Sequence, residues 1–210
     1  MLTPLQRRLA RLLTELPQAR GFALAGGAAL IARGLVDRGT RDLDFFSTSA
    51  SAIAILVPAL ETRLAGEGLR VTRIRDVPGF VRLEVLAPDG ERVEIDLSHD
   101  ARQHPAEPTE LGLTLSQDEL AADKVLALFG RAEVRDFVDV AALLEVYPAD
   151  RLLELAAAKD AGFSVNRFVE ALAAVHRFDA ADFTGTGAAF DQLVARFDAW
   201  RQHLAAPGNL

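Results

Sequence analysis

The chain has 210 residues, half of them hydrophobic, and a formal net charge of −7. This length fits one α/β domain with a helical extension, and the negative charge argues against a protein that coats nucleic acid through bulk positive charge. The chain has no cysteine, which excludes disulfides and thiolate metal sites and fits a cytoplasmic protein. We find neither a signal peptide nor an apolar run of about 18 residues, so no membrane span is expected.

The first part of the chain alternates between helical and strand patterns. Leucines recur at helical spacing near the N-terminus, and a short apolar run then ends at a glycine pair. In chain order the patterns predict helix 5–16, strand 22–25, helix 28–36, strand 41–46 and helix 51–66. Pro58 lies inside the last of these, so it must kink the helix or mark its true start.

The middle of the chain is strand-like and the remainder is helical. Strands are predicted at 69–75, 80–87 and 92–98, and Pro88-Asp89-Gly90 is a turn signal that joins the last two as a hairpin. A proline-containing loop follows, and helices are predicted at 117–129, 133–146, 149–158, 164–176 and 188–204. These patterns predict a mixed half and a helical half that meet near residues 105–115.

Two carboxylates lie two residues apart in the strand predicted at 41–46. The period of a strand places Asp42 and Asp44 on one face. Their charges repel unless a cation lies between them, and hard cations such as Mg²⁺ prefer oxygen ligands. A polar face of a surface strand is the ordinary explanation of an isolated D-x-D pair.

A third carboxylate is available on the strand predicted at 92–98. Val93, Ile95 and Leu97 alternate with Glu94 and Asp96 there. We choose Asp96 as the third ligand, because it lies nearer the C-terminal end of its strand. Strands of a hairpin also expose polar residues to solvent, so Asp96 alone does not indicate a metal site. The metal-site hypothesis depends on the order of the elements: a strand, a glycine pair, a helix and two acidic strands.

The pair Gly26-Gly27 lies between a predicted strand and a predicted helix. Glycine permits positive φ and close backbone approach, and a helix N-terminus offers free N–H groups to phosphate. An ordinary strand-to-helix turn explains an isolated glycine pair equally well. Neither G-x-G-x-x-G nor a Walker A pattern is present, which argues against a dinucleotide fold and a P-loop.

Two blocks of sequence resemble the AbiEii/AbiGii toxin family of nucleotidyltransferases, within the DNA polymerase β-like superfamily. The first block combines Leu24-Ala25-Gly26-Gly27-Ala28-Ala29-Leu30 with Arg41-Asp42-Leu43-Asp44-Phe45-Phe46. The second combines Leu120-Ala121-Ala122-Asp123-Lys124-Val125-Leu126 with Arg135-Asp136-Phe137-Val138-Asp139-Val140. The resemblance covers roughly residues 20–145.

The resemblance implies roles for particular side chains. Asp42 and Asp44 match the carboxylates that hold the metal of the triphosphate, and Asp96 is the candidate that activates the acceptor hydroxyl. Lys124 matches the motif lysine that contacts phosphates, and Asp139 matches the acidic residue of the fourth motif.

Nucleotide binding would also involve other groups. Gly26 and Gly27 would offer backbone N–H groups to the nucleotide, and Arg131, seven residues after Lys124, could reach the same phosphates. Lys124 could instead be an ordinary solvated lysine. Asp139 could instead form an ion pair with neighbours on the helix surface.

The resemblance further implies a fold and a division of the chain. We expect an α+β protein with a polymerase β-like nucleotidyltransferase core, a mixed sheet with flanking helices, over residues 1–110. Residues 111–210 would form a mainly helical region that packs against this core and completes the site.

The implied reaction is Mg²⁺- or Mn²⁺-dependent transfer of a nucleoside monophosphate from an NTP to a hydroxyl acceptor. The protein would be the toxin of a toxin–antitoxin pair, with an antitoxin protein as partner and RNA, such as tRNA, or a protein as acceptor. The strands of residues 69–98 carry five arginines that could bind RNA phosphates, or could simply form a solvated sheet face: Arg70, Arg73, Arg75, Arg82 and Arg92. Alternation places Arg73 and Arg75 on one face.

Two other functions remain open from the sequence. One is a nucleotidyltransferase for a small molecule of the aminoglycoside type, which would need an acidic cleft for its cationic acceptor. The other is a protein of the same fold that binds nucleotide without turnover. The three intact aspartates argue against the second.

Overall fold

The computed structural model describes residues 1–206, and the chain divides into two compact units. The first unit comprises Met1–Gly34 and Gly39–Ser116, and the second comprises Leu35–Arg38 and the chain from Gln117 onward. We expected a division after residue 110. In the structure the division follows Ser116, and the short segment Leu35–Arg38 belongs to the second unit.

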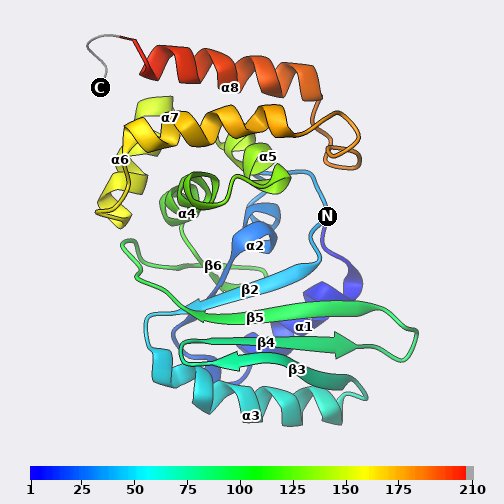
Figure 1. Ribbon diagram of the computed structural model, residues 1–210. Helices are drawn as coiled ribbons and strands as arrows, with labels where there is room; N and C mark the ends of the chain where they lie inside the picture. The colour runs from blue at the N-terminus through cyan, green and yellow to red at the C-terminus, as the bar shows by residue number, and fades with distance from the viewer. Residues whose placement is uncertain (207–210) are drawn as a thin grey trace. The chain divides into compact units, whose positions relative to one another are not determined.

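The first unit is built on a single mixed sheet (Figure 1). Among residues 1–206 its strands follow the order β3-β4-β5-β2-β1-β7-β6. Their bounds are β1 Phe22–Ala25, β2 Asp42–Ser47, β3 Arg70–Val77, β4 Phe80–Leu86, β5 Arg92–His99, β6 Glu107–Thr109 and β7 Gly112–Thr114. Strand β2 is antiparallel to β1 and parallel to β5, so the two acidic strands are neighbours near the middle of the sheet.

Helices flank the sheet of the first unit. They are α1 Pro4–Thr14, the 3-10 turn η1 Pro17–Ala19, α2 Gly26–Ala32 and α3 Ala50–Gly66. A capping box begins α1, because Thr3 Oγ1 accepts a hydrogen bond from the Gln6 backbone N–H and the Gln6 side chain accepts one from Thr3 N–H. Helix α3 continues through Pro58 and begins eight residues earlier, so the proline does not mark its start.

The sheet has one apolar face and one polar face. Buried side chains alternate along the three strands β2, β4 and β5: Leu43, Phe45, Val81, Leu83, Val85, Val93, Ile95 and Leu97. Arg73 of β3 pairs with Leu83 in the sheet and makes a salt bridge to Glu61 of α3, which places α3 over the apolar face. The intervening residues of β2 and β5, including all three aspartates, lie on the other face, as period-two alternation predicts.

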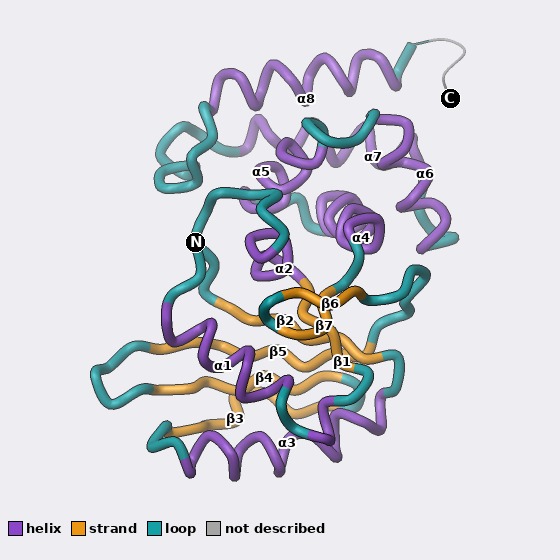
Figure 2. Tube along the Cα trace, turned by 180° about the vertical axis from the view of Figure 1, so that it is seen from behind, coloured by secondary structure: helices purple, strands orange, loops and turns teal. Residues whose placement is uncertain are grey.

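The described part of the second unit is helical (Figure 2). Its helices are α4 Gln117–Gly130, α5 Val134–Leu143, α6 Ala149–Lys159, α7 Val165–Ala173, the 3-10 turn η2 Ala174–Arg177 and α8 Phe190–Leu204. Aromatic rings join them: Phe137 of α5 meets Phe197 of α8 at 5.1 Å between centroids, and Phe168 of α7 meets Trp200 of α8 at 5.2 Å. Within residues 1–206, no helix combines the length and the apolar character needed to cross a bilayer.

The predicted α+β class and mixed sheet are confirmed, together with most of the expected elements. Two short strands, β6 and β7, occur where we expected only a proline-containing loop. Each has three residues, too few for alternation to be visible, and they pair around the turn that precedes Gly112. The helix expected at 28–36 begins at Gly26 and ends at Ala32.

The first prediction concerns the packing of α3. Leu60→Ala should lower the free energy of unfolding by about 3 kcal/mol, because Leu60 is fully buried and its truncation leaves a cavity. Ile55→Ala on the same helix should change it by less than about 0.5 kcal/mol, because Ile55 is largely exposed. Urea unfolding measures both. Equal losses for the two variants would contradict this orientation of α3.

Candidate active site

The three predicted carboxylates lie together on the polar face of the sheet. Strands β2 and β5 are parallel and in register, with Asp44 directly opposite Asp96 and Asp42 directly opposite Glu94. Neighbouring strands lie about 4.8 Å apart, so carboxylates opposite one another are within reach of a single cation. Asp96 is buried, while Asp42 and Asp44 are half-buried.

The loop before β2 fixes the first carboxylate. Thr40 Oγ1 donates a hydrogen bond to Asp42 Oδ1 at 2.6 Å. The carbonyl of Thr40 accepts a hydrogen bond from Gln6 Nε2 at 2.8 Å, and Gln6 is a buried residue of α1. The orientation of Asp42 is therefore tied to the N-terminal helix.

The glycine pair is placed against the second carboxylate. Gly26 has φ +60°, and a Cβ at this position would lie 1.8 Å from Asp44 Oδ2. Only glycine combines this backbone conformation with the absence of a clashing side chain. Gly27, the second residue of α2, is buried. The predicted turn thus brings backbone next to the carboxylate of Asp44.

An arginine from β4 holds the third carboxylate. Arg82 lies directly opposite Asp96 in the antiparallel pair, donating from Nε to Oδ1 at 2.7 Å and from Nη2 to Oδ2 at 2.6 Å. Arg82 Nη1 also lies 3.4 Å from Glu94 Oε2. The hydrogen bonds to Asp96, followed by the charges of Asp96, Glu94 and Asp42, raise the pKa of Arg82 above its ordinary value.

From the sequence we expected Arg82 only as one of five arginines that could bind RNA phosphates. Its pairing with Asp96 could have been predicted from the turn signal, because a hairpin centred on Asp89 places residue 82 opposite residue 96. Alternation then places both side chains on one face.

The arginines of the sheet do not all share a face. A register shift lies between Arg73 and Arg75, so Arg73 pairs with Leu83 on the apolar side and Arg75 pairs with Arg82 on the polar side. The prediction that Arg73 and Arg75 share a face is therefore wrong, because a bulge interrupts the alternation. Arg70, Arg75, Arg82 and Arg92 remain on the face of the carboxylates.

The second unit contains a buried ionic cluster of Arg38, Lys124 and Asp139. Arg38 donates from Nε and Nη2 to the two carboxylate oxygens of Asp139 at 2.7 Å each, and Lys124 Nζ lies 2.9 Å from Asp139 Oδ2. Burial acts to raise the pKa of Asp139, but the charge of Lys124 and the hydrogen bonds and charge of Arg38 outweigh it and lower that pKa. The cluster carries two positive charges and one negative charge.

Lys124 and Asp139, which the sequence assigned to the site, are thus brought together. Arg38 was missed, because it lies in the irregular segment before β2, where neither periodicity nor a motif marks it. Its contact with Asp139 spans 101 residues of sequence.

Arg131 lies just after the last residue of α4. It donates from Nε and Nη2 to the carboxylate of Asp136 at 2.8 Å each. Asp136 is fully buried and also accepts a hydrogen bond from the Glu133 backbone N–H at the start of α5. Arg131 therefore stabilises the junction of α4 and α5, and its contact with phosphates stays a prediction.

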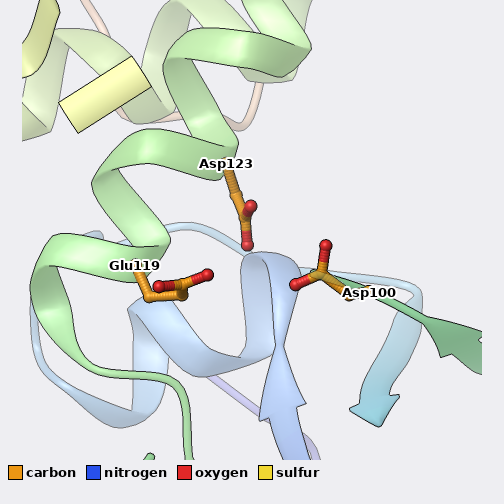
Figure 3. Close-up of side chains that lie close together, drawn as sticks. All are labelled: Asp100, Glu119 and Asp123. Atoms are coloured by element: carbon orange, nitrogen blue, oxygen red, sulfur yellow. The ribbon is translucent and has the colours of Figure 1, made fainter. Parts of the chain in front are cut away.

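A second acidic pair projects from α4, where Glu119 and Asp123 lie one turn apart (Figure 3). Lys159 at the end of α6 lies 2.7 Å from Glu119 Oε1 and forms a salt bridge with Asp123. Both Lys159 and Glu119 have buried side chains. This pairing joins α6 to α4 within the second unit, and sequence reasoning did not single it out.

The mixed sheet, the glycine turn and the two acidic strands in register agree with the nucleotidyltransferase fold expected from the sequence. The model of the family described as nucleotidyl transferase AbiEii toxin, type IV TA system, matches residues 7–206. The match spans nearly the whole chain, so the protein belongs to the AbiEii family of nucleotidyltransferase toxins. A comparison with curated protein sequences finds no match.

Two bacterial proteins of known structure have a similar fold. MenT4, a nucleotidyltransferase toxin from Mycobacterium tuberculosis, is 19% identical with a TM-score of 0.68, covering 96% of this chain and 83% of that one. JHP933 from Helicobacter pylori is 15% identical with a TM-score of 0.65, covering 97% of this chain and 93% of that one. At these identities the likeness establishes the fold.

The second prediction concerns the contact between Gly26 and Asp44. Gly26→Ala should reduce nucleotidyl transfer at least about a hundredfold, because the added methyl group displaces a carboxylate of the site. Gly34→Ala is a matched control: Gly34 also has positive φ, at +69°, but a Cβ there meets nothing within 4 Å. The control should retain transfer despite similar backbone strain. Equal loss in both variants would assign the effect to the backbone alone.

The third prediction concerns the charge of Asp139. Asp139→Asn should destabilise the protein by about 3–5 kcal/mol at neutral pH, because Lys124 and Arg38 would stay buried without their anion. The pKa of Asp139 is lowered by folding, so its contribution is fully present above the ordinary value of 3.8 and is lost as pH falls through the folded value. Urea unfolding at a series of pH values measures the effect.

The matched control for this experiment is Asp150→Asn, an exposed residue of α6. This control should have the wild-type free energy of unfolding at neutral pH and should lose as much of it in acid as the wild type does. The Asp139→Asn variant should lose less stability than the wild type as the pH falls below the ordinary pKa of 3.8. A parallel decline in both proteins would show that the Asp139 carboxylate does not titrate with folding.

Proposed function

We propose that the protein transfers a nucleoside monophosphate from an NTP to a hydroxyl acceptor and uses Mg²⁺ or Mn²⁺ held by Asp42, Asp44 and Asp96. One observation carries the proposal: Asp44 lies directly opposite Asp96 on adjacent parallel strands, on the same face as Asp42. A buried carboxylate facing another carboxylate needs compensating positive charge. The nucleotidyltransferase family of the chain supports the same chemistry.

The donor set fits a hard divalent cation. It consists of carboxylate oxygens only, with Glu94 as a further acidic neighbour opposite Asp42. When bound, the cation would neutralise phosphate charge and align the triphosphate for displacement. The half-buried Asp42 and Asp44 leave room for phosphate oxygens and water in the remaining coordination positions.

Each carboxylate then has a separate task. Asp42 and Asp44 orient the triphosphate, since Thr40 and Gly26 fix their positions. Asp96 accepts the proton of the acceptor hydroxyl as that oxygen attacks the α-phosphorus, and pyrophosphate leaves. The backbone N–H groups of Gly26 and Gly27 would contact the phosphates, because no side chain separates them from the ligand.

Lys124 and Asp139 of the second unit have separate proposed roles. Lys124 and Arg38 both form salt bridges with Asp139. In this proposal Asp139 orients Lys124, and Lys124 contacts the nucleotide phosphates. Arg131 would extend that contact from the end of α4, where 44% of its side chain is exposed.

RNA, such as a tRNA, is the acceptor in this proposal. Arg70 and Arg75 lie on the face of the three carboxylates, where they could contact RNA phosphates. Arg82 and Arg92 on the same face form salt bridges with Asp96 and Glu84. The protein would act in the cytoplasm, where NTPs and RNA are present, as a toxin controlled by an antitoxin protein.

The fourth prediction tests this function. The protein, Mg²⁺ and total RNA are incubated with each of the four α-labelled NTPs, and transfer of label to RNA is measured. Asp42→Asn, Asp44→Asn and Asp96→Asn should each lower transfer by about 10²- to 10⁴-fold. Asp89→Asn, an exposed residue of the β4–β5 turn, should retain wild-type transfer.

Other outcomes separate the competing functions. Transfer of label to an aminoglycoside but not to RNA would contradict the proposed acceptor. NTP binding without transfer to RNA, protein or small molecules would contradict turnover. Unchanged transfer by the three aspartate variants would contradict the assigned metal site.

A further inference from the structure

The contact between Arg82 and Asp96 places a permanent cation inside the proposed metal site. Both carboxylate oxygens of Asp96 accept hydrogen bonds from the guanidinium, at 2.7 and 2.6 Å. Such a two-pronged contact fixes the plane of the carboxylate as well as its position. Asp96 is buried, so its charge would be costly without this partner.

The opposite face of the sheet carries a pair with the same geometry. Arg73 donates from Nε and Nη2 to the carboxylate of Glu61, at 2.6 and 2.8 Å. That pair joins β3 to α3 and contacts no residue of the proposed site. A substitution of Arg73 therefore reports what the loss of a two-pronged pair does to folding. A substitution of Arg82 reports in addition what its guanidinium does at the carboxylates.

Several negative groups surround Arg82. Glu94 Oε2 lies 3.4 Å from its Nη1, and the charge of Asp42 acts on it as well. On its other side Arg82 lies over the ring of Phe80, 5.9 Å from the centroid. The guanidinium therefore has a second carboxylate and an aromatic face beside it when it leaves Asp96.

A divalent cation must compete with this guanidinium. An oxygen of Asp96 can coordinate a metal through a lone pair that Arg82 does not use, but the two cations then lie close together and repel, which favours displacement of the guanidinium. The positive charge of Arg82 therefore weakens metal binding at all three aspartates in the absence of nucleotide. An NTP that arrives with its metal adds phosphate oxygens as ligands and overcomes this competition.

We propose that Arg82 is a positioning residue that holds Asp96 in the metal-free enzyme and exchanges with the divalent cation when the metal–NTP complex binds. The inference rests on the proposed function, since it assumes that the three aspartates bind the metal. It assigns Arg82 a role at the carboxylates in addition to any contact with acceptor phosphates. The enzyme would consequently bind metal weakly until nucleotide is present.

The fifth prediction tests the exchange without relying on turnover. Mn²⁺ is titrated into the nucleotide-free protein, and free Mn²⁺ is measured by electron paramagnetic resonance. Arg82→Gln should bind Mn²⁺ roughly tenfold more tightly than the wild type, because it removes one positive charge about 5 Å from the divalent ion. Arg82→Lys, which keeps the charge but not the two-pronged geometry, should lie between them.

Two further variants serve as controls. Arg73→Gln breaks the matched pair on the opposite face and should keep the wild-type Mn²⁺ affinity. Asp42→Asn should lose Mn²⁺ binding, which locates the ion at the aspartates. If Arg82→Gln does not fold, the comparison between Arg82→Lys and the wild type carries the test, and tighter Mn²⁺ binding is still expected.

Transfer assays provide a second measurement. In Arg82→Gln the Mn²⁺ concentration for half-maximal transfer should fall, because no guanidinium competes with the metal at Asp96. A purely structural role would lower the rate without tighter metal binding. Equal Mn²⁺ affinity in wild type, Arg82→Gln and Arg82→Lys, with binding lost in Asp42→Asn, would overturn the exchange and leave the metal site intact. If neither the wild type nor any variant bound Mn²⁺, both the exchange and the assigned metal site would be overturned.

Discussion

The repulsion between neighbouring carboxylates is the constraint on which the first unit depends. The parallel register of β2 and β5 places Asp44 opposite Asp96, and such a pair is unfavourable unless positive charge lies nearby. Three features compensate. Arg82 neutralises Asp96, Thr40 satisfies Asp42, and the missing side chain of Gly26 lets Asp44 lie against the backbone. The three compensating groups come from β4, from the loop before β2 and from the start of α2, so the site exists only when the sheet is assembled.

The second unit solves a similar problem with the opposite excess of charge. Asp139 is fully buried between Arg38 and Lys124, so that two cations are desolvated for one anion. Helices α4 and α5 supply the lysine and the aspartate, while the short segment Leu35–Arg38 supplies the arginine.

Much of the fold could be predicted from the sequence, because strands β2, β4 and β5 each have one buried face and therefore alternate clearly. Alternation also placed the aspartates correctly. It failed at Arg73 and Arg75, where a bulge shifts the register, and it was silent for β6 and β7, which are too short. The ion pairs of Arg38 and Arg131 depend on tertiary contacts and on a helix end, neither of which has a periodic signal.

The central claim is that the aspartates of β2 and β5 bind the divalent cation of a nucleotidyl transfer reaction. A crystal structure of the protein with Mn²⁺ and a non-hydrolysable NTP analogue tests it most directly, because the anomalous signal locates the metal. We expect the Mn²⁺ peak within coordination distance of Asp42, Asp44 and Asp96, with the analogue's phosphates as further ligands. A peak elsewhere, or a bound analogue whose metal does not contact these aspartates, would contradict the account.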